Sequence, residues 1–198
     1  REQHIRRDRA TSNICTAQVL LAVTAAMYAV YHGPNKLRAI AERVHRLTMT
    51  LAISLRKADF AVVHDHYFDT LRVTAPGALE RAAESGINLR DLGDGDVGIA
   101  LDETVGDGEL AELLAVFGAK QTTPQSEVLP ASLERKSPFL EHPVFNRYHS
   151  ETEFMRYLHR LETKDLALNT SMIPLGSCTM KLNAAAEMEP ISWPGFAD

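Results

Sequence analysis

This chain has few cysteines and no excess of positive charge. The 198 residues include only two cysteines, Cys15 and Cys178, and no metal-ligand spacing joins them, so we expect reduced thiols. Lysine and arginine number 21 against 26 acidic residues, which gives a net charge of −5. An acidic chain is not attracted to polyanions, and this argues against broad binding to nucleic acid or to an anionic membrane.

The chain also lacks a hydrophobic run suited to crossing a bilayer. Residues 14–31 form its most apolar stretch, but Thr16, Gln18 and Thr24 interrupt this stretch, which is at the short end for a membrane span. We expect a buried helix here that ends at Gly33-Pro34, because glycine and proline stop helices. Since the helix is apolar nearly all round, most of its sides should be covered, in part by a second copy in a dimer.

The spacing of apolar side chains predicts a second helix from Asn35 onward. Its length is about six turns at 3.6 residues per turn. The apolar stripe is expected to face a core, and it consists of Leu37, Ile40, Ala41, Val44, Leu47, Thr48, Leu51 and Leu55.

Short strands and helices are predicted to alternate after this helix. Together they form a compact α+β unit, roughly residues 34–118. The predicted strands are 60–63, 70–73, 87–90 and 97–101, and the predicted helices are 78–85 and a segment that begins near Asp107.

Two histidines in this unit raise the question of a metal site. His64 and His66 would share a face of a strand, with Asp65 and Asp69 nearby. A third ligand is not evident, and a polar turn between strands explains the same residues. We therefore predict no metal site.

The region after the α+β unit lacks periodicity. Gly118 to Pro138 reads as a linker with several prolines and small polar residues. Ser150 and Glu153 then form a capping box, which predicts the start of another helix.

The stretch richest in chemical information lies near the end of the chain. Gly176-Ser177-Cys178-Thr179-Met180-Lys181 precedes the helix-forming run 182–188. Small polar side chains and free amides at a helix start suit an anion. The same cluster is also an ordinary N-cap, so both interpretations stay open.

Several strings of residues, in one order, resemble a known family. They resemble the P-protein of the glycine cleavage system, the pyridoxal-phosphate-dependent glycine decarboxylase. The strings are R-E-Q-H-I-R-R-D-R-A-T-S-N-I-C-T-A-Q (1–18), A-M-Y-A-V-Y-H-G-P (26–34), F-D-T-L (68–71), S-P-F-L-E-H-P-V-F-N-R-Y-H-S-E-T-E (137–153), N-T-S-M-I-P-L-G-S-C-T-M-K-L-N-A-A-A-E-M (169–188) and W-P-G-F (193–196).

The resemblance implies an α/β fold and a division of the chain. The chain would be a fragment of a duplicated fold-type-I transferase that depends on pyridoxal phosphate, with a small α+β domain and the start of a second half. Residues 1–33 would end the large domain of the first half, and residues 34–122 would form its small α+β domain. A linker, 123–149, would lead to the start of the second, cofactor-bearing half, 150–198.

The resemblance also implies an activity. Such an enzyme decarboxylates glycine with pyridoxal 5'-phosphate and transfers the aminomethyl group to the lipoyl arm of H-protein, as a homodimer in bacterial cytoplasm or the mitochondrial matrix. The family's Schiff-base lysine belongs to a later His-Lys motif, beyond this chain. We therefore expect no catalytic residue here and an inactive fragment.

The resemblance suggests a supporting role for the stretch that begins at Gly176 and continues to Asn183, called the Gly176 loop below. We expect its side chains to border the active site without acting as acid, base or nucleophile, and we do not expect Lys181 to hold the cofactor. Cys178 is either a redox-sensitive thiol or a buried, inert one. Two other functions stay open: a non-catalytic dimerisation or scaffold module, and another aminotransferase-like enzyme. The bordering residues are Ser177, Cys178, Thr179, Lys181 and Asn183.

Overall fold

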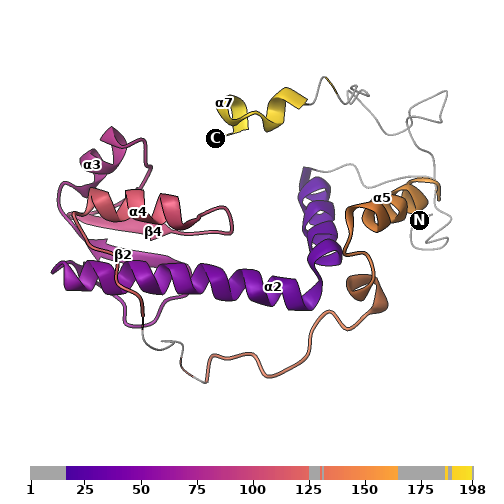
Figure 1. The fold of residues 1–198 in the computed structure, drawn as a ribbon, viewed down its shortest axis with the longest axis horizontal. Coiled ribbons are helices and arrows are strands. Elements are labelled where there is room, and N and C mark those ends of the chain that lie inside the picture. The colour runs from indigo at the N-terminus through magenta and orange to yellow at the C-terminus, as the bar shows by residue number, and fades with distance from the viewer. Residues whose placement is uncertain (1–16, 125–129, 131, 165–185, 187–188, 198) are drawn as a thin grey trace. The chain divides into compact units, whose positions relative to one another are not determined.

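A computed structural model describes residues 17–124, 130, 132–164, 186 and 189–197 of the chain (Figure 1). It divides into two compact units. Unit 1 comprises Arg1–Gly33 and Glu141–Asp198, and unit 2 comprises Pro34–Leu140. The domain boundaries predicted at residues 33, 122 and 149 stay predictions.

Helix α2, Ala17–Lys57, contributes a segment to each unit and is interrupted at Gly33. The backbone there has φ 64° and ψ 176°, which is not helical. The predicted helix end at Gly33-Pro34 is therefore confirmed. Helical structure resumes directly because proline suits the first helical position, where no intrahelical N–H bond is needed. The second segment, which ends at Lys57, is the predicted six-turn helix.

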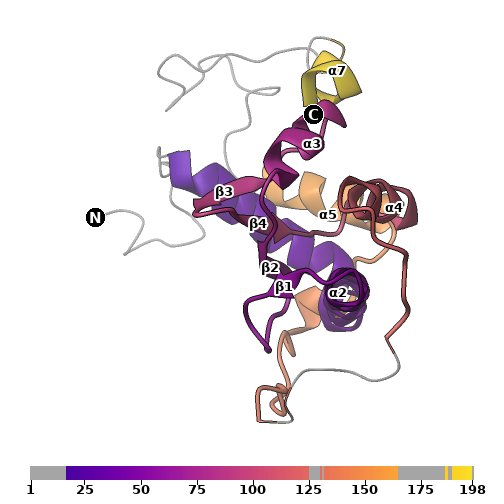
Figure 2. The ribbon, with the colours of Figure 1, turned by 90° about the vertical axis from the view of Figure 1, so that its left-hand side faces the viewer.

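Unit 2 contains a four-stranded antiparallel sheet in the order β1-β2-β4-β3. Figure 2 shows the strands beside α2 and α4. Strand β4 forms a hairpin with β3 and also pairs with β2, so it lies between these two strands. The elements are β1 (Ala61–Val62), β2 (Thr70–Thr74), α3 (Ala78–Glu84), β3 (Arg90–Gly93), β4 (Asp96–Ala100) and α4 (Asp107–Val116).

One predicted strand is displaced in the structure. The sequence pattern favoured residues 87–90, whereas β3 spans Arg90–Gly93. The reason is the tight turn at Asp94 and Gly95, both with positive φ (54° and 81°), which lets two strands meet directly on either side. Ile87 and Leu89 instead pack against the core from the segment before the strand.

The core of unit 2 lies between one face of the sheet and the helices. Along β2, Leu71 and Val73 are buried while their neighbours are exposed, as the two-residue period of a strand requires. The helices add the other side chains, and the apolar stripe predicted for residues 35–55 is confirmed at its core positions. Fully or almost fully buried members include Leu51, Leu55, Leu71, Val73, Ala78, Ala82, Val97, Ile99, Leu110 and Leu114.

Unit 1 is helical in its described parts. It contains the first segment of α2, followed later in the chain by η2 (Pro143–Asn146), α5 (Glu151–Glu162), η3 (Glu189–Ser192) and α7 (Pro194–Ala197). The predicted cap is confirmed, because the Ser150 hydroxyl accepts a hydrogen bond of 3.4 Å from the Glu153 amide.

The first segment of α2 exposes apolar side chains in the described structure. Leu20 and Leu21 are 71% and 74% exposed, and Val23 is 50% exposed. Packing from described residues is found at the other end of the segment, where the Tyr31 and Phe154 rings meet edge to face at 5.4 Å. The predicted cover of this segment, in part by a second copy, stays a prediction.

Helices and a small antiparallel sheet are consistent with the α/β class expected from the sequence. No helix within the described ranges is long and apolar enough to span a bilayer.

Candidate functional site

The residues predicted to border an active site cannot be placed. Ser177, Cys178, Thr179, Lys181 and Asn183 all lie outside the described residues. Their role stays a prediction, and the chemistry of the described part has to be built from other side chains.

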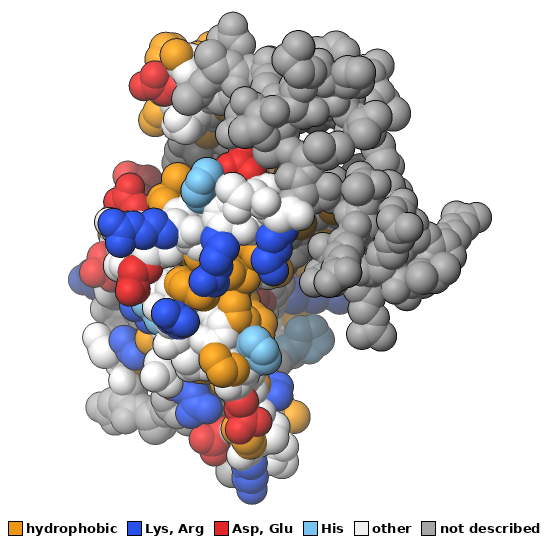
Figure 3. All heavy atoms as spheres, turned by 90° about the vertical axis from the view of Figure 1, so that its right-hand side faces the viewer, with side chains coloured by type: hydrophobic (Ala, Val, Ile, Leu, Met, Phe, Trp, Pro, Cys, Tyr) orange, Lys and Arg blue, Asp and Glu red, His pale blue; other side chains and the backbone are white. Residues whose placement is uncertain are grey.

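The helix that precedes this loop in sequence carries a cluster of aromatic and basic side chains. Tyr148 and Tyr157 stack with ring centroids 4.2 Å apart. The Arg160 guanidinium lies 5.6 Å and 5.3 Å from their ring centroids and donates a hydrogen bond to the Tyr148 hydroxyl. Figure 3 shows one face of the molecule, on which Lys and Arg side chains lie next to hydrophobic ones. The arrangement joins α5 to Tyr148 in the segment before it, and it engages the Tyr148 hydroxyl with Arg160.

A close contact within unit 1 brings together two of the strings that carry the family resemblance. Gly33 ends the string at 26–34, and His149 belongs to the string at 137–153. A β carbon on Gly33 would overlap the His149 ring and would lie 2.7 Å from the carbonyl oxygen of Phe145. Only glycine fits here, both for space and for the positive φ.

Unit 2 holds a cavity of about 590 Å³ against one face of α2. Its helical wall repeats at three- and four-residue intervals, so these side chains share one face. The rest of the lining comes from Phe68, whose ring stacks on His45, and from described parts of the segment after α4. The lining residues are Arg38, Ala41, Glu42, His45, Arg46, Met49, Thr50, Phe68, Thr123, Pro124, Leu133, Glu134 and Arg135.

His45 is the chemically distinctive residue of this cavity. Its side chain is 4% exposed, and its ring stacks on Phe68 with centroids 5.1 Å apart and planes 10° from parallel. The Nδ1 atom lies 2.9 Å from the carbonyl oxygen of Phe68. Because a carbonyl only accepts, Nδ1 must carry the hydrogen, and Nε2 of the neutral ring is then an acceptor. That buried Nε2 has no hydrogen-bond partner in the structure.

No motif or spacing in the sequence predicted a role for His45. The sequence does contain one signal for its position on the helix. His45 lies four residues from Ala41 and four residues from Met49. That spacing predicts a shared face, but it does not predict which face borders a cavity.

Tyr67, next to Phe68, carries a second buried polar atom, its hydroxyl oxygen, and within the described residues no group meets hydrogen-bond geometry with it, although the Arg56 side chain is near. Burial raises the pKa of the Tyr67 hydroxyl, while the nearby Arg56 guanidinium opposes this change. A tyrosine with a raised pKa stays neutral, so Tyr67 is not suited to act as a base.

The two histidines considered for a metal site lie on exposed turns. Arg56 donates a hydrogen bond of 3.1 Å to the main-chain oxygen of His64 and lies 3.8 Å from the 96%-exposed carboxylate of Asp65. Across the described ranges, no group of three or more potential ligands comes together.

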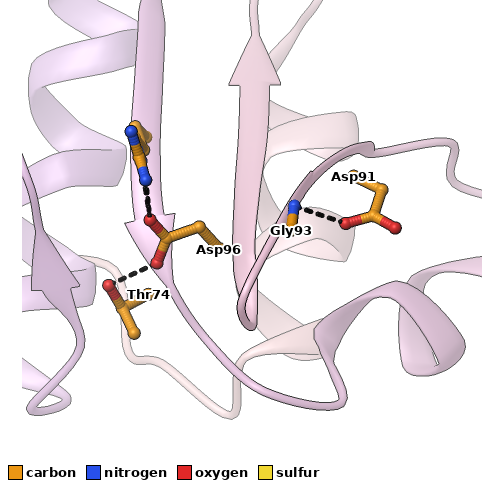
Figure 4. Close-up of polar contacts among 5 residues, drawn as sticks. Thr74, Asp91, Gly93 and Asp96 are labelled. Atoms are coloured by element: carbon orange, nitrogen blue, oxygen red, sulfur yellow. Dashed lines mark hydrogen bonds and ion pairs between the residues drawn. The ribbon is translucent and has the colours of Figure 1, made fainter.

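The Asp96 carboxylate on β4 is paired with two side chains of β2 (Figure 4). Arg72 Nε and Thr74 Oγ1 on β2 each donate to it at 2.6 Å. These two donors, Thr74 first, lower the pKa of the Asp96 carboxyl. With every partner supplied by the neighbouring strand, Asp96 joins β2 to β4 and is not free to react.

The residues that line the cavity against α2 do not fit the lysine-linked form of pyridoxal phosphate. A lysine holds that cofactor in such enzymes, and no described lysine lines this cavity.

Comparison with known proteins identifies the family. A family model for the glycine cleavage system P-protein matches residues 1–117. Proteins named glycine dehydrogenase (decarboxylating) from Thermosynechococcus vestitus and Synechocystis are each 59% identical over 99% of this chain, and one from Pseudomonas putida is 56% identical over all of it. The chain spans only 21–22% of the length of these relatives. With the family model covering more than half of its residues, the chain belongs to the glycine cleavage system P-protein family.

Proposed function

We propose that this chain forms part of an enzyme that decarboxylates glycine and passes the aminomethyl group to the lipoyl arm of H-protein. The observation that carries the proposal is 56–59% identity along the whole chain to proteins named glycine dehydrogenase (decarboxylating). As the chain covers about a fifth of those proteins, the activity is assigned to a longer protein and not to these residues alone.

The proposed enzyme depends on pyridoxal 5'-phosphate, which acts as an electron sink when carbon dioxide leaves an amino acid. The lysine that holds it is proposed to lie beyond this chain. Glycine and lipoylated H-protein are the proposed substrates, a homodimer is the proposed assembly, and bacterial cytoplasm or mitochondrial matrix is the proposed location. The resemblance described above supports all of these.

The proposed architecture is a duplicated fold-type-I transferase. In it, residues 1–33 end one large domain, 34–122 form a small α+β domain, 123–149 link the halves, and 150–198 begin the cofactor-bearing half. The compact antiparallel sheet of unit 2 supports the small-domain assignment.

The direct test is the release of labelled carbon dioxide from carboxyl-labelled glycine. The complete protein that contains these residues is assayed with pyridoxal phosphate and lipoylated H-protein, and the isolated chain is assayed in parallel. We expect release by the complete protein and none by the chain. Release from another amino acid, with none from glycine, would favour a different aminotransferase-like enzyme.

The same preparation of the complete protein distinguishes the proposed enzyme from a non-catalytic scaffold. A scaffold would bind no cofactor even in the complete protein, whereas the enzyme should show the visible absorbance of protein-bound pyridoxal phosphate. The isolated chain should show no such band, because its cofactor lysine is proposed to lie elsewhere.

The role of the Gly176 loop needs its own variants in the complete protein. If Thr179 and Lys181 border the active site, Thr179→Ala and Lys181→Gln should weaken the affinity for glycine or the cofactor. Lys164→Gln, which removes an exposed charge after α5, is the matched control and should leave both affinities unchanged. Unchanged affinities in the two loop variants would remove the loop from the proposed site.

A further inference from the structure

We propose that residues 120–124, which follow α4, form a strap that opens from α2 while the core of unit 2 stays folded. One hydrogen bond between Thr122 and Ser54, called the latch below, holds the strap closed. The strap belongs to unit 2, and all of its residues are described. The proposal does not depend on the proposed decarboxylase function.

The latch joins residues that lie 68 positions apart in sequence. The Thr122 amide donates to the Ser54 hydroxyl oxygen at 2.9 Å, and the same hydroxyl donates to the main-chain oxygen of Thr50 at 2.7 Å. A serine hydroxyl has one hydrogen and two lone pairs, so it makes both bonds at once. Because Ser54 is 0% exposed, water does not reach its side chain while the strap is closed.

The start of the strap is fixed to the core. Gly118 ends α4 with φ 63°, which favours glycine. The amides of Gly118 and Ala119 donate to the carbonyl oxygens of Ala115 and Leu114 at 2.9 and 3.0 Å, and Ala119 packs against the core of unit 2. None of these contacts involves the strap, so the strap can leave α2 while α4 and its end stay in place.

Little else holds the strap closed. Lys120, Gln121 and Thr123 are exposed, and Thr122 and Pro124 are only partly buried. Counting bonds to described residues, Thr122 is the one strap residue whose amide donates a hydrogen bond. A segment with few buried side chains and one shielded bond opens at a lower free energy than a packed core.

Opening of the strap changes the surface beside α2. Thr123 and Pro124 are among the residues that line the cavity against this helix, so opening removes part of the cavity's lining. In the proposed architecture, Thr122 is also the last residue of the small domain. The latch would then fix the point at which the proposed linker leaves that domain.

The test is hydrogen exchange of the complete protein in low concentrations of urea, followed by mass spectrometry of its peptides. The peptide 119–124 reports the strap, and peptides from the paired strands β2 and β4 report the core. A local opening exposes little surface, so its exchange hardly depends on urea. Exchange through unfolding of the core rises steeply with urea, because much surface is exposed.

Two variants assign the latch. Ser54→Ala removes the acceptor for the Thr122 amide. Thr48→Val is the matched control, because Thr48 is also 0% exposed on α2 and its hydroxyl also donates to a main-chain oxygen four residues earlier, that of Val44, at 3.0 Å. No described strap residue bonds to the Thr48 hydroxyl, so its loss tests for a general loss of stability.

We expect the Thr122 amide of the parent protein to be protected and its exchange to be nearly independent of urea. Ser54→Ala should accelerate this exchange about five-fold, as the loss of one net hydrogen bond allows, and Thr48→Val should not. Equal acceleration by the two variants would overturn the proposal, and so would a Thr122 amide that is unprotected in the parent.

The urea dependence decides the question without any variant. If exchange in the strap follows the urea dependence of β2 and β4, the strap opens only together with the core, and the proposal is wrong. This comparison uses the parent protein alone, so it remains decisive if Ser54→Ala does not fold.

Discussion

The imidazole of His149 lies against the α carbon of Gly33, although the two residues are far apart in sequence. The contact holds the break in α2 to the turn before α5, within unit 1. Glycine is required for two separate reasons: its φ is 64°, and a β carbon would overlap the ring. These two reasons can be separated by experiment.

Gly33→Ala should destabilise its surroundings in unit 1. The effect should exceed that of alanine at a positive-φ glycine where the new β carbon meets only open space. Gly118→Ala is the matched control, because Gly118 has φ 63° and open space around its missing β carbon. The positive-φ backbone costs roughly 1–2 kcal/mol at Gly118 and roughly 1–3 kcal/mol at Gly33, whose ψ of 176° lies in a region open essentially to glycine only. Overpacking adds about 1–3 kcal/mol at Gly33. Hydrogen exchange measures the local effect, in the peptides around residues 33 and 149 for Gly33→Ala and around residue 118 for the control. Equal local destabilisation by both substitutions would contradict a close contact at His149.

Asp96→Asn should lower the stability of unit 2 at neutral pH and weaken its dependence on pH. Hydrogen bonds from Thr74 and Arg72 lower the pKa of Asp96 below its usual 3.8. A group with a lowered folded-state pKa stabilises the fold above its unfolded pKa, and that stability is lost as the pH falls through the folded value.

The measurement is the urea midpoint of the chain at pH 7 and at decreasing pH below about 4. The unchanged protein should lose stability over this acid range, and Asp96→Asn should lose less of it. Asp94→Asn, at the exposed hairpin turn where asparagine tolerates the positive φ, is the control and should behave like the parent. Identical acid profiles for the parent and Asp96→Asn would show that the Arg72 and Thr74 contacts do not form.

Ser150→Ala should weaken the first turn of α5. The Ser150 hydroxyl accepts from the Glu153 amide, and loss of such a cap costs about 1 kcal/mol. Faster hydrogen exchange in residues 151–154 would report the loss. Thr152→Ala removes a hydroxyl from the same exposed turn without removing the cap, and it should leave exchange unchanged or slower. Faster exchange in Thr152→Ala than in Ser150→Ala would argue against capping.

Leu55→Ala should destabilise unit 2 by about 2–5 kcal/mol, because it empties a fully buried position between the helix and the sheet. Leu92→Ala is the control, since Leu92 is 38% exposed on β3 and its loss leaves no enclosed cavity. Urea unfolding followed by circular dichroism compares the two. A loss of similar size for both would mean that Leu55 does not lie in the core.

Much of the local structure of unit 2 follows from sequence periodicity. The stripe from Leu37 to Leu55 repeats at helical spacing, and the structure buries Val44, Leu51 and Leu55 on it. Gly86, with φ 73°, ends α3 as its position after an alanine-rich run predicts. These features depend on residues within one turn of each other, so a single sequence can reveal them.

The displaced strand shows where such local patterns fail. Ile87 and Leu89 have the side chains of a strand, but the two-residue turn at Asp94 fixes β3 further along the chain. Leu20 and Leu21 have the apolarity of a core helix and are exposed in the described structure, so their predicted cover stays a prediction. A sequence pattern predicts which face a segment can bury, and tertiary packing decides what covers that face.

The sequence by itself determined the family, the break at Gly33 and the helices and most strands of unit 2, because these depend on neighbouring residues or on long matching strings. Only the tertiary structure placed His149 on Gly33, Asp96 between Arg72 and Thr74, and His45 in the wall of a cavity. Each of these relationships joins segments that are distant along the chain. Their contact is decided by which strands pair and which helix faces meet, and no periodicity within one segment contains that information.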